Sequence, residues 1–220
     1  MKKLLVFLVA TLMILGLAAQ SHAMLSSGLS VLGTDSLGNQ LIYDSALNVT
    51  WYDSTRGYDT WQNQVNWAAG LTVSFNGQSI SGWRLPSTVD NPSSAGYNVT
   101  SSEMGHLYYT ELGNKAPFDA NGNQQSGWGL TNTGPFKNLS ASGYWSGTPY
   151  SADNTSPGSA WYFYYSSGYQ NYNSRNASYL AMAVTPGDVA TPIPGPFMLF
   201  GSGLAWIAAM GGLYRRPEGN

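Results

Sequence analysis

The sequence has no cysteine, only two histidines and little charge. The lack of cysteine excludes disulfides, thiolate nucleophiles and cysteine-ligated metal centres, so the fold must be stabilised by packing. Lys, Arg, Asp and Glu together make up 9% of the residues, and the formal net charge is -2. The few basic side chains are scattered along the chain, so a surface for a phosphate backbone is missing and no nucleic-acid partner is predicted.

Sequence motifs of catalysis are also missing. The chain contains no Gly-x-Ser-x-Gly elbow, no His-Glu-x-x-His zinc motif and no phosphate-binding glycine loop. His106 falls beside the apolar stripe of an expected helix, which favours a solvated side chain over a general base. Asp53, Glu103 and Glu111 offer carboxylates for acid–base work, but nothing in the sequence indicates that their pKa values are raised. We therefore predict that the protein is not an enzyme.

The amino terminus has the three parts of a secretion signal. Met1–Lys3 supplies positive charge, Leu4–Ala19 is apolar, and Ser21–Ala23 has the small residues of a cleavage site. This order predicts a signal peptide over residues 1–23 and a mature chain that begins near Met24. An uncleaved anchor is the alternative, but the apolar stretch is short for a membrane span.

A second apolar stretch, without charge, ends at two arginines near the carboxyl terminus. As a helix it would be roughly 27 Å long, enough for a thin bilayer core, and the arginines favour the cytoplasmic side. We therefore predict a transmembrane helix over residues 197–214 and a cytoplasmic basic tail over residues 215–220. Prolines prevent a helix in residues 191–196, which are expected to form an extended stalk.

This order of prolines, apolar span and arginines resembles the PEP-CTERM sorting signal. The residues that carry the resemblance are Pro192, Pro194, Pro196, Arg215 and Arg216. The sequence departs from the pattern at Ile193, where many members have Glu. The resemblance implies an exosortase as partner, an exported protein, and a final place in the cell envelope or the extracellular polysaccharide matrix.

The region between the two end signals is rich in aromatic residues set among Gly, Ser and Asn. Aromatic side chains suit pleated, half-buried surfaces, while Gly and Asn supply positive φ at turns. We therefore predict one α+β domain over residues 24–190. Short helices are expected at residues 61–69, from apolar spacing, and at 103–112, after a Thr100–Glu103 capping box and before Gly113. Strands are expected at residues 39–43, 49–52, 160–165, 169–173 and 179–184.

Several segments occur in the same order as in the Lcl C-terminal-like domain. Gly82-Trp83-Arg84-Leu85-Pro86-Ser87 is the most specific of them. The other segments are Asp44–Asp53, Trp61–Ala68, Tyr144–Thr148, Ala160–Phe163 and Ala183–Gly187. The resemblance spans roughly residues 38–188 and implies a C-type-lectin-like fold, in which two short helices flank an irregular antiparallel sheet. It also implies an adhesive module that binds sulfated or other glycans in those members whose role is known.

The hairpin formed by the strands at 160–165 and 169–173 offers a candidate glycan surface. Aromatic rings can cover the apolar face of a pyranose while amides bind its hydroxyls. The candidate ligand-binding residues are Tyr162, Tyr164, Tyr169, Asn171, Tyr172, Asn173 and Arg175. The alternative is that these tyrosines only cover the sheet, with either Trp161 and Phe163 or Tyr162 and Tyr164 facing the core. Long polar stretches at residues 87–99 and 118–133 are expected to be surface loops, where binding residues tend to lie.

The segment Gly82, Trp83, Arg84, Leu85 and Pro86 is predicted to be structural. An arginine inside an apolar motif is usually a buried fork of donors that ties loops together. We expect Arg84 to bind a carboxylate such as Asp53.

A metal site is not predicted, and calcium is only a weak alternative. Asp119, Asn121 and Asn123 alternate like the opening of an oxygen-ligand loop, but the Gly and the closing Glu of an EF-hand are missing. A polar surface loop is therefore the favoured interpretation.

The sequence as a whole favours an exported, non-catalytic surface or matrix protein with a glycan-binding ectodomain. Its expected partners are an exosortase, the membrane and extracellular polysaccharide. A purely structural envelope or biofilm component remains an open alternative, and an envelope glycosidase is the least favoured one.

Overall fold

The computed structural model describes residues 28–155 and 157–190. The predicted signal peptide, stalk, transmembrane helix and basic tail lie outside these residues. In chain order the elements are β1 (Leu29–Thr34), β2 (Gln40–Asp44), β3 (Val49–Asp59), α1 (Trp61–Gly70), β4 (Val73–Phe75), β5 (Gln78–Ile80), η1 (Pro92–Ser94), α2 (Glu103–Gly105), η2 (His106–Glu111), β6 (Gly143–Tyr150), β7 (Ser159–Tyr164), β8 (Tyr169–Ser174) and β9 (Tyr179–Pro186).

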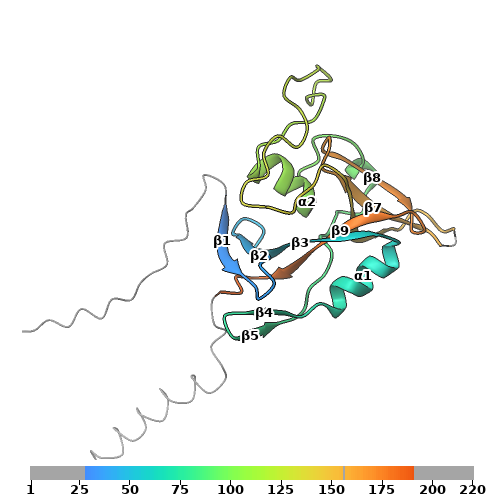
Figure 1. The fold of residues 1–220 in the computed structure, drawn as a ribbon. Helices are drawn as coiled ribbons and strands as arrows, with labels where there is room; N and C mark the ends of the chain where they lie inside the picture. Colours follow the sequence, from blue (N-terminus) through green and yellow to red (C-terminus); the bar gives the residue numbers. More distant parts are fainter. Residues whose placement is uncertain (1–27, 156, 191–220) are drawn as a thin grey trace, which may run out of the picture.

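Seven strands form one sheet in the order β1-β2-β3-β9-β6-β7-β8 (Figure 1). The α+β class expected from the sequence is confirmed. The prediction of an antiparallel sheet is wrong at one place, because β9 pairs with β6 in parallel through Tyr144 and Leu180. The last strand thus enters the middle of the sheet and joins an amino-terminal meander of three strands to a carboxyl-terminal one, β6-β7-β8.

Both faces of the central strands are buried. Along β9, Leu180, Met182 and Val184 belong to one apolar cluster, whereas the alternate residues from Tyr179 to Ala183 belong to the other. Side chains from α2, η2 and the chain up to Leu139 cover the first face, and α1 with the β4–β5 hairpin covers the second (Figure 1). The sheet is therefore the middle layer of three, which explains how a chain without disulfides buries so many rings.

The helix expected near residue 61 is confirmed as α1, with Trp61 and Ala68 buried on its inner side. The capping box predicted for the second helix is wrong. Ser102 is the N-cap, and its Oγ accepts the Gly105 N–H at 3.0 Å. From His106 onward the chain forms a π-helix, and Gly113, at a φ of +65°, follows it as predicted.

The expected strands are confirmed as β2, β3, β7, β8 and β9, but three features were missed. Strands β1 and β6 were not predicted, and neither was the β4–β5 hairpin, although Val73-Ser74-Phe75 alternates and the Asn76-Gly77 that follows is a hairpin-turn signal. The β7–β8 loop also contains four residues rather than three, because Tyr164 still pairs with Tyr169. Tyr165 thus leaves the strand, and its ring is fully buried.

Candidate functional site

An open groove lies between the segment of residues 93–101 and the loop of residues 118–122. Its volume is about 630 Å³, and it is called the Tyr97 groove below. It forms where the two long polar stretches of the sequence meet. The residues that line it are Ser93, Tyr97, Asn98, Val99, Thr100, Ser101, Phe118, Asp119, Ala120 and Gly122.

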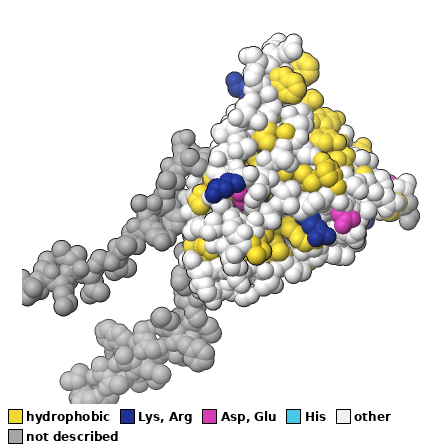
Figure 2. Space-filling model, viewed as in Figure 1, with side chains coloured by type: hydrophobic (Ala, Val, Ile, Leu, Met, Phe, Trp, Pro, Cys, Tyr) yellow, Lys and Arg dark blue, Asp and Glu magenta, His cyan; other side chains and the backbone are white. Residues whose placement is uncertain are grey.

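Two partly exposed aromatic rings form the apolar part of the groove. The Tyr97 residue is 37% exposed and the Phe118 residue 45% exposed, and their ring centroids lie 6.4 Å apart. The ring of Tyr169, on β8, lies 4.9 Å from that of Tyr97 and supports it from the sheet. Hydrophobic side chains also surface at the top and along the right side of the view in Figure 2, over the region of β7, β8 and the loop above them.

The backbone beneath Tyr97 is held to the edge of the sheet. Gly96 and Gln170 exchange two backbone hydrogen bonds, of 2.7 and 2.9 Å, across the outer edge of β8. The Gln170 side chain donates a third to the Ser94 carbonyl at 2.6 Å. Asn98, at a φ of +60°, reaches across and donates from Nδ2 to the Phe118 carbonyl. These bonds fix the two walls of the groove relative to each other.

One charged side chain lines the groove, that of Asp119. Its carboxylate accepts hydrogen bonds from the backbone N–H groups of Asn121 and Asn123 and from Asn123 Nδ2, at 2.8–3.0 Å. The Asn123 side chain, followed by these backbone donors, lowers the pKa of Asp119, so the carboxylate is ionised at neutral pH. Asp119, Asn121 and Asn123 therefore form a turn in which donors of the loop itself bind both oxygens of the Asp119 carboxylate, as in a polar loop. The calcium alternative stays a prediction.

The seven hairpin residues predicted as a sugar surface do not share one surface. Tyr162 is buried, and its ring stacks on Tyr179 at 4.6 Å, so it cannot act as an exposed platform. Tyr164 shares that face of β7, and its hydroxyl lies 3.5 Å from that of Tyr179. That hydrogen bond, together with burial, raises the pKa of Tyr164 to about 12. Tyr162 therefore fits the alternative interpretation of the sequence, in which these tyrosines cover the sheet.

The remaining hairpin residues are divided between the two faces of β8. Asn171 Nδ2 donates to the Tyr169 hydroxyl, and Asn173 Nδ2 donates to the Tyr179 hydroxyl on the same face. Tyr172 points the other way and stacks on Tyr150, with centroids 3.8 Å apart. Of the predicted set, Tyr169 is the residue that supports the Tyr97 groove through a ring contact.

Arg175 is engaged in the fold rather than presented to a ligand. Its guanidinium carbon lies 4.7 Å above the ring of Trp61, and its Nε donates to the Ser159 carbonyl at 3.1 Å. Its own carbonyl accepts the Trp61 N–H. Arg175 therefore connects the end of β8 to the start of α1.

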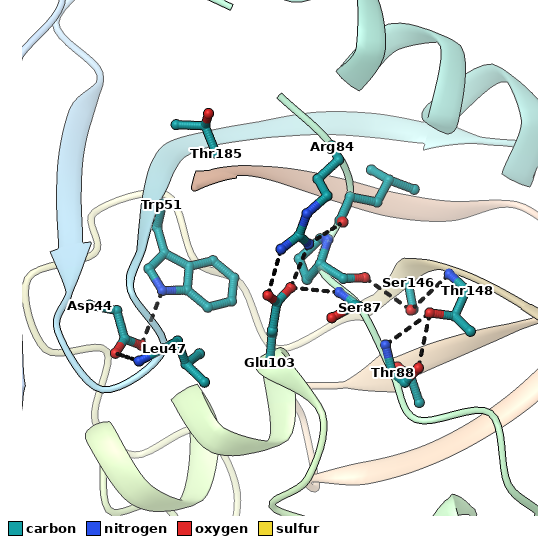
Figure 3. Close-up of polar contacts among 12 residues, drawn as sticks. Asp44, Leu47, Trp51, Arg84, Ser87, Thr88, Glu103, Ser146, Thr148 and Thr185 are labelled. Carbon is teal, nitrogen blue, oxygen red and sulfur yellow. Dashed lines mark hydrogen bonds and ion pairs between the residues drawn. The ribbon is translucent and has the colours of Figure 1, made fainter. Parts of the chain in front are cut away.

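The segment from Gly82 to Pro86 lies against β9, where Arg84 and Val184 exchange two backbone hydrogen bonds. Arg84 binds a carboxylate as predicted, but the carboxylate is that of Glu103 and not that of Asp53. Arg84 Nη1 and Nη2 donate to the two carboxylate oxygens of Glu103, each at 2.7 Å (Figure 3), and this hydrogen bond raises the pKa of Arg84. Asp53 instead accepts the backbone N–H groups of Lys137 and Asn138. The Arg84 side chain is also 41% exposed, so it is not the buried fork that was expected.

The other residues of this segment anchor it on both sides. Trp83 is buried and donates from Nε1 to the Ile80 carbonyl at 3.0 Å. Leu85 is buried in the same apolar cluster. The Pro86 carbonyl accepts both the Gly147 N–H and the Ser146 hydroxyl, from β6.

The expectation of a solvated His106 is wrong. Its side chain is 18% exposed, and Nε2 lies 3.0 Å from Glu111 Oε1. The sequence pattern missed this contact because it assumed α-helical spacing, whereas residues 106–111 form a π-helix.

The residues of the sorting signal, Pro192, Pro194, Pro196, Arg215 and Arg216, lie outside the described residues. Within residues 28–155 and 157–190, the helices are too short and too polar to cross a bilayer.

Comparisons of the chain with protein-family models, with curated proteins and with solved structures find no match.

Proposed function

We propose that this is an exported surface or matrix protein whose domain binds a neutral glycan in the Tyr97 groove. The observation that carries the proposal is the pair of partly exposed rings, Tyr97 and Phe118, beside a wall of hydroxyl and amide groups. The groove volume falls within the range of ordinary small-ligand sites.

The chemistry of the groove suits a pyranose. A sugar ring has an apolar C–H face that packs on aromatic rings, and Tyr97 with Phe118 offers such a surface. Exposed Ser93, Thr100 and Ser101 supply hydroxyls that donate to and accept from those of a sugar.

The charge of the groove favours an uncharged ligand. None of the described residues that line it is Lys or Arg, and Asp119 is ionised. A sulfated or uronic-acid-rich glycan would therefore meet a negative charge without a cation to balance it. This is why the proposal names a neutral glycan.

The proposed location rests on the two ends of the sequence. Export follows from the signal peptide predicted at residues 1–23, and envelope or matrix placement follows from the predicted PEP-CTERM tail with its exosortase partner. A surface or matrix protein would meet extracellular polysaccharide, which is consistent with a sugar-sized groove.

A glycan array that carries neutral and sulfated oligosaccharides tests the proposal, with the full chain purified in a mild detergent. We expect binding to neutral glycans that weakens about tenfold, or about 1.4 kcal/mol, in Tyr97→Ala and in Phe118→Ala. Tyr58→Ala is the matched control, because Tyr58 is an exposed ring that does not line the groove.

The array also separates the proposal from its main alternative. If no glycan binds reproducibly, with or without calcium, the protein is a structural envelope or biofilm component. The burial of Tyr162 and the structural contacts of Arg175 favour that alternative over a sugar surface on the hairpin itself. Binding restricted to sulfated glycans would contradict the charge argument.

A further inference from the structure

Three side chains that can bind a metal meet at the end of β2. Asp44 closes that strand, while His106 and Glu111 belong to η2, more than sixty residues later in the chain. One ligand atom from each side chain lies within 4.8 Å of the other two. Bonds of about 2.0–2.2 Å in a tetrahedral site place neighbouring ligand atoms roughly 3.4 Å apart, so the widest separation in the cluster would shorten by about an ångström on binding an ion.

The π-helix brings two of these residues to the same side. Side chains five positions apart on an α-helix would point about 140° away from each other. In η2 the backbone closes hydrogen bonds over five residues, as from the Leu112 N–H to the Leu107 carbonyl, and His106 and Glu111 have the same separation. Their side chains therefore meet, with 3.0 Å between Nε2 and Oε1.

Glu111, one of the three residues of this cluster, has an unsatisfied carboxylate oxygen. Its side chain is only 4% exposed, and its Oε2 is buried without a hydrogen-bond partner among the described residues. A buried carboxylate oxygen without a partner costs free energy, because it has lost water and gained nothing in return. The atom is thus placed to bind something that the protein chain itself does not supply.

The cluster also brings two buried carboxyl groups together. Asp44 is fully buried, and the Glu111 side chain is 4% exposed. A divalent cation would compensate two carboxylates at once, and buried charges persist when they are paired or when they coordinate a metal.

We propose that Asp44, His106 and Glu111 bind a divalent transition-metal ion, with Zn²⁺ as the best match. One imidazole nitrogen and two carboxylate oxygens, without thiolate, are ligands that Zn²⁺ accepts, whereas Ca²⁺ prefers six or more oxygens. The partly exposed edge of His106 provides the route from solvent. A water molecule would complete the coordination.

The surroundings of the cluster orient its ligands. Asp44 Oδ1 accepts the backbone N–H groups of Ala46 and Leu47, and Oδ2 accepts Trp51 Nε1 at a longer 3.3 Å (Figure 3). Such outer contacts hold a ligand carboxylate in one orientation. A Cβ on Gly28 would lie 2.9 Å from Ser45 Oγ and 3.4 and 3.5 Å from the two Glu111 oxygens, so a larger residue at this position would crowd the Glu111 carboxylate.

The ion would connect two parts of the fold. It would join the β2–β3 turn to η2, which packs on the first face of the sheet. Because Asp44 is fully buried and Glu111 nearly so, a sugar cannot enter between their carboxylates. The cluster is therefore a stabilising metal site and not a glycosidase centre.

The test uses the full chain, purified in detergent and treated with a chelator. We expect Zn²⁺ to bind at one site per chain in calorimetric titration and to raise the Tm, and Co²⁺ to give visible absorption bands of a bound ion. His106→Gln should lose the heat, the Tm increase and the bands. Asp153→Asn is the control and should keep all three, because it changes a carboxylate of the described domain that lies outside this cluster.

Glu111→Gln gives a second variant, should His106→Gln not fold. It keeps the shape of the side chain and should also lose binding. If wild-type protein shows neither Zn²⁺ heat nor a rise in Tm, the cluster is only a hydrogen-bonded ion pair and the proposal is overturned. Equal binding by wild type and His106→Gln would overturn it as well.

Discussion

The ion pair between Arg84 and Glu103 offers the sharpest test of how this fold is held together. The Glu103 carboxylate accepts two hydrogen bonds from Arg84, each at 2.7 Å, and one from the Ser87 N–H at 2.6 Å (Figure 3). It thereby ties the segment that follows Gly82 to the start of α2. Glu103→Gln weakens these hydrogen bonds with little change in side-chain volume. The amide keeps one acceptor oxygen but turns an NH₂ donor toward the Arg84 guanidinium.

The expected loss follows from the exposure of the two side chains. Hydrogen bonds to a charged group contribute roughly 1.5–3 kcal/mol each. The Glu103 side chain is 12% exposed, but that of Arg84 is 41% exposed. Water can therefore replace part of the hydrogen bonding that the guanidinium loses in the variant. We expect Glu103→Gln to lower the free energy of unfolding by about 2 kcal/mol. For a domain of this size that is a decrease in Tm of roughly 4–8 °C.

Urea unfolding, followed by tryptophan fluorescence, measures the effect in a double-mutant cycle. Arg84→Ala should have a lower free energy of unfolding and be more sensitive to protease. The double variant Arg84→Ala/Glu103→Gln should lose clearly less free energy of unfolding than the sum of the two single losses. The control is Arg56→Ala, because Arg56 and Asp59 lie 3.9 Å apart at the surface, and no measurable change is expected. A coupling between Arg84 and Glu103 below about 0.5 kcal/mol would refute the reasoning.

Two further predictions concern backbone strain and pH. Gly168→Ala should lower the free energy of unfolding by more than about 2 kcal/mol, because a Cβ at its φ of +76° would collide with the rings of Tyr109 and Tyr108. Gly187→Ala is the control, because Gly187 has a similar φ of +78° with open space around it. This control should lose only about 1 kcal/mol in the same urea assay. Burial raises the pKa of Asp35. The hydrogen bonds that its carboxylate accepts, led by that from Tyr52, lower the pKa by more, so the net pKa lies below 3.8. A depressed folded-state pKa contributes stability that is present above the unfolded value and is lost as pH falls through the folded one. The urea midpoint should therefore fall less steeply below about pH 4 in Asp35→Asn than in wild type, and equal slopes would contradict this.

Local patterns in the sequence were sufficient for several elements. The apolar spacing from Trp61 to Ala68 predicted α1, and the aromatic alternation on both sides of Ser166-Ser167-Gly168 predicted the β7–β8 hairpin. These elements have the periods of regular helices and strands, and they are joined by residues that suit turns. In contrast, β6 has a shift of register between Trp145 and Pro149, which breaks the alternation on which a strand prediction depends.

The candidate sites depended on contacts that no local pattern contains. Most of the Tyr97 groove falls within the two polar stretches that were expected to be surface loops, but the pairing of Gly96 with Gln170, which brings one of them to the edge of β8, is a tertiary contact. The tyrosines of the hairpin appeared available for a ligand, yet α1 and its neighbours bury Tyr162 on the second face of the sheet. A sequence period of two shows that faces alternate, and it does not show that both will be covered.

The sequence by itself determined the α+β class, the positions of the main strands and of α1, and the lack of any thiol chemistry. It also contains the two end segments from whose composition export is proposed. Only the tertiary structure decided which carboxylate binds Arg84, which rings line a groove, and that Asp44 meets His106 and Glu111. The physical reason is that propensity and periodicity act over a few residues, whereas these contacts depend on how β9 enters the sheet and how the layers pack over it.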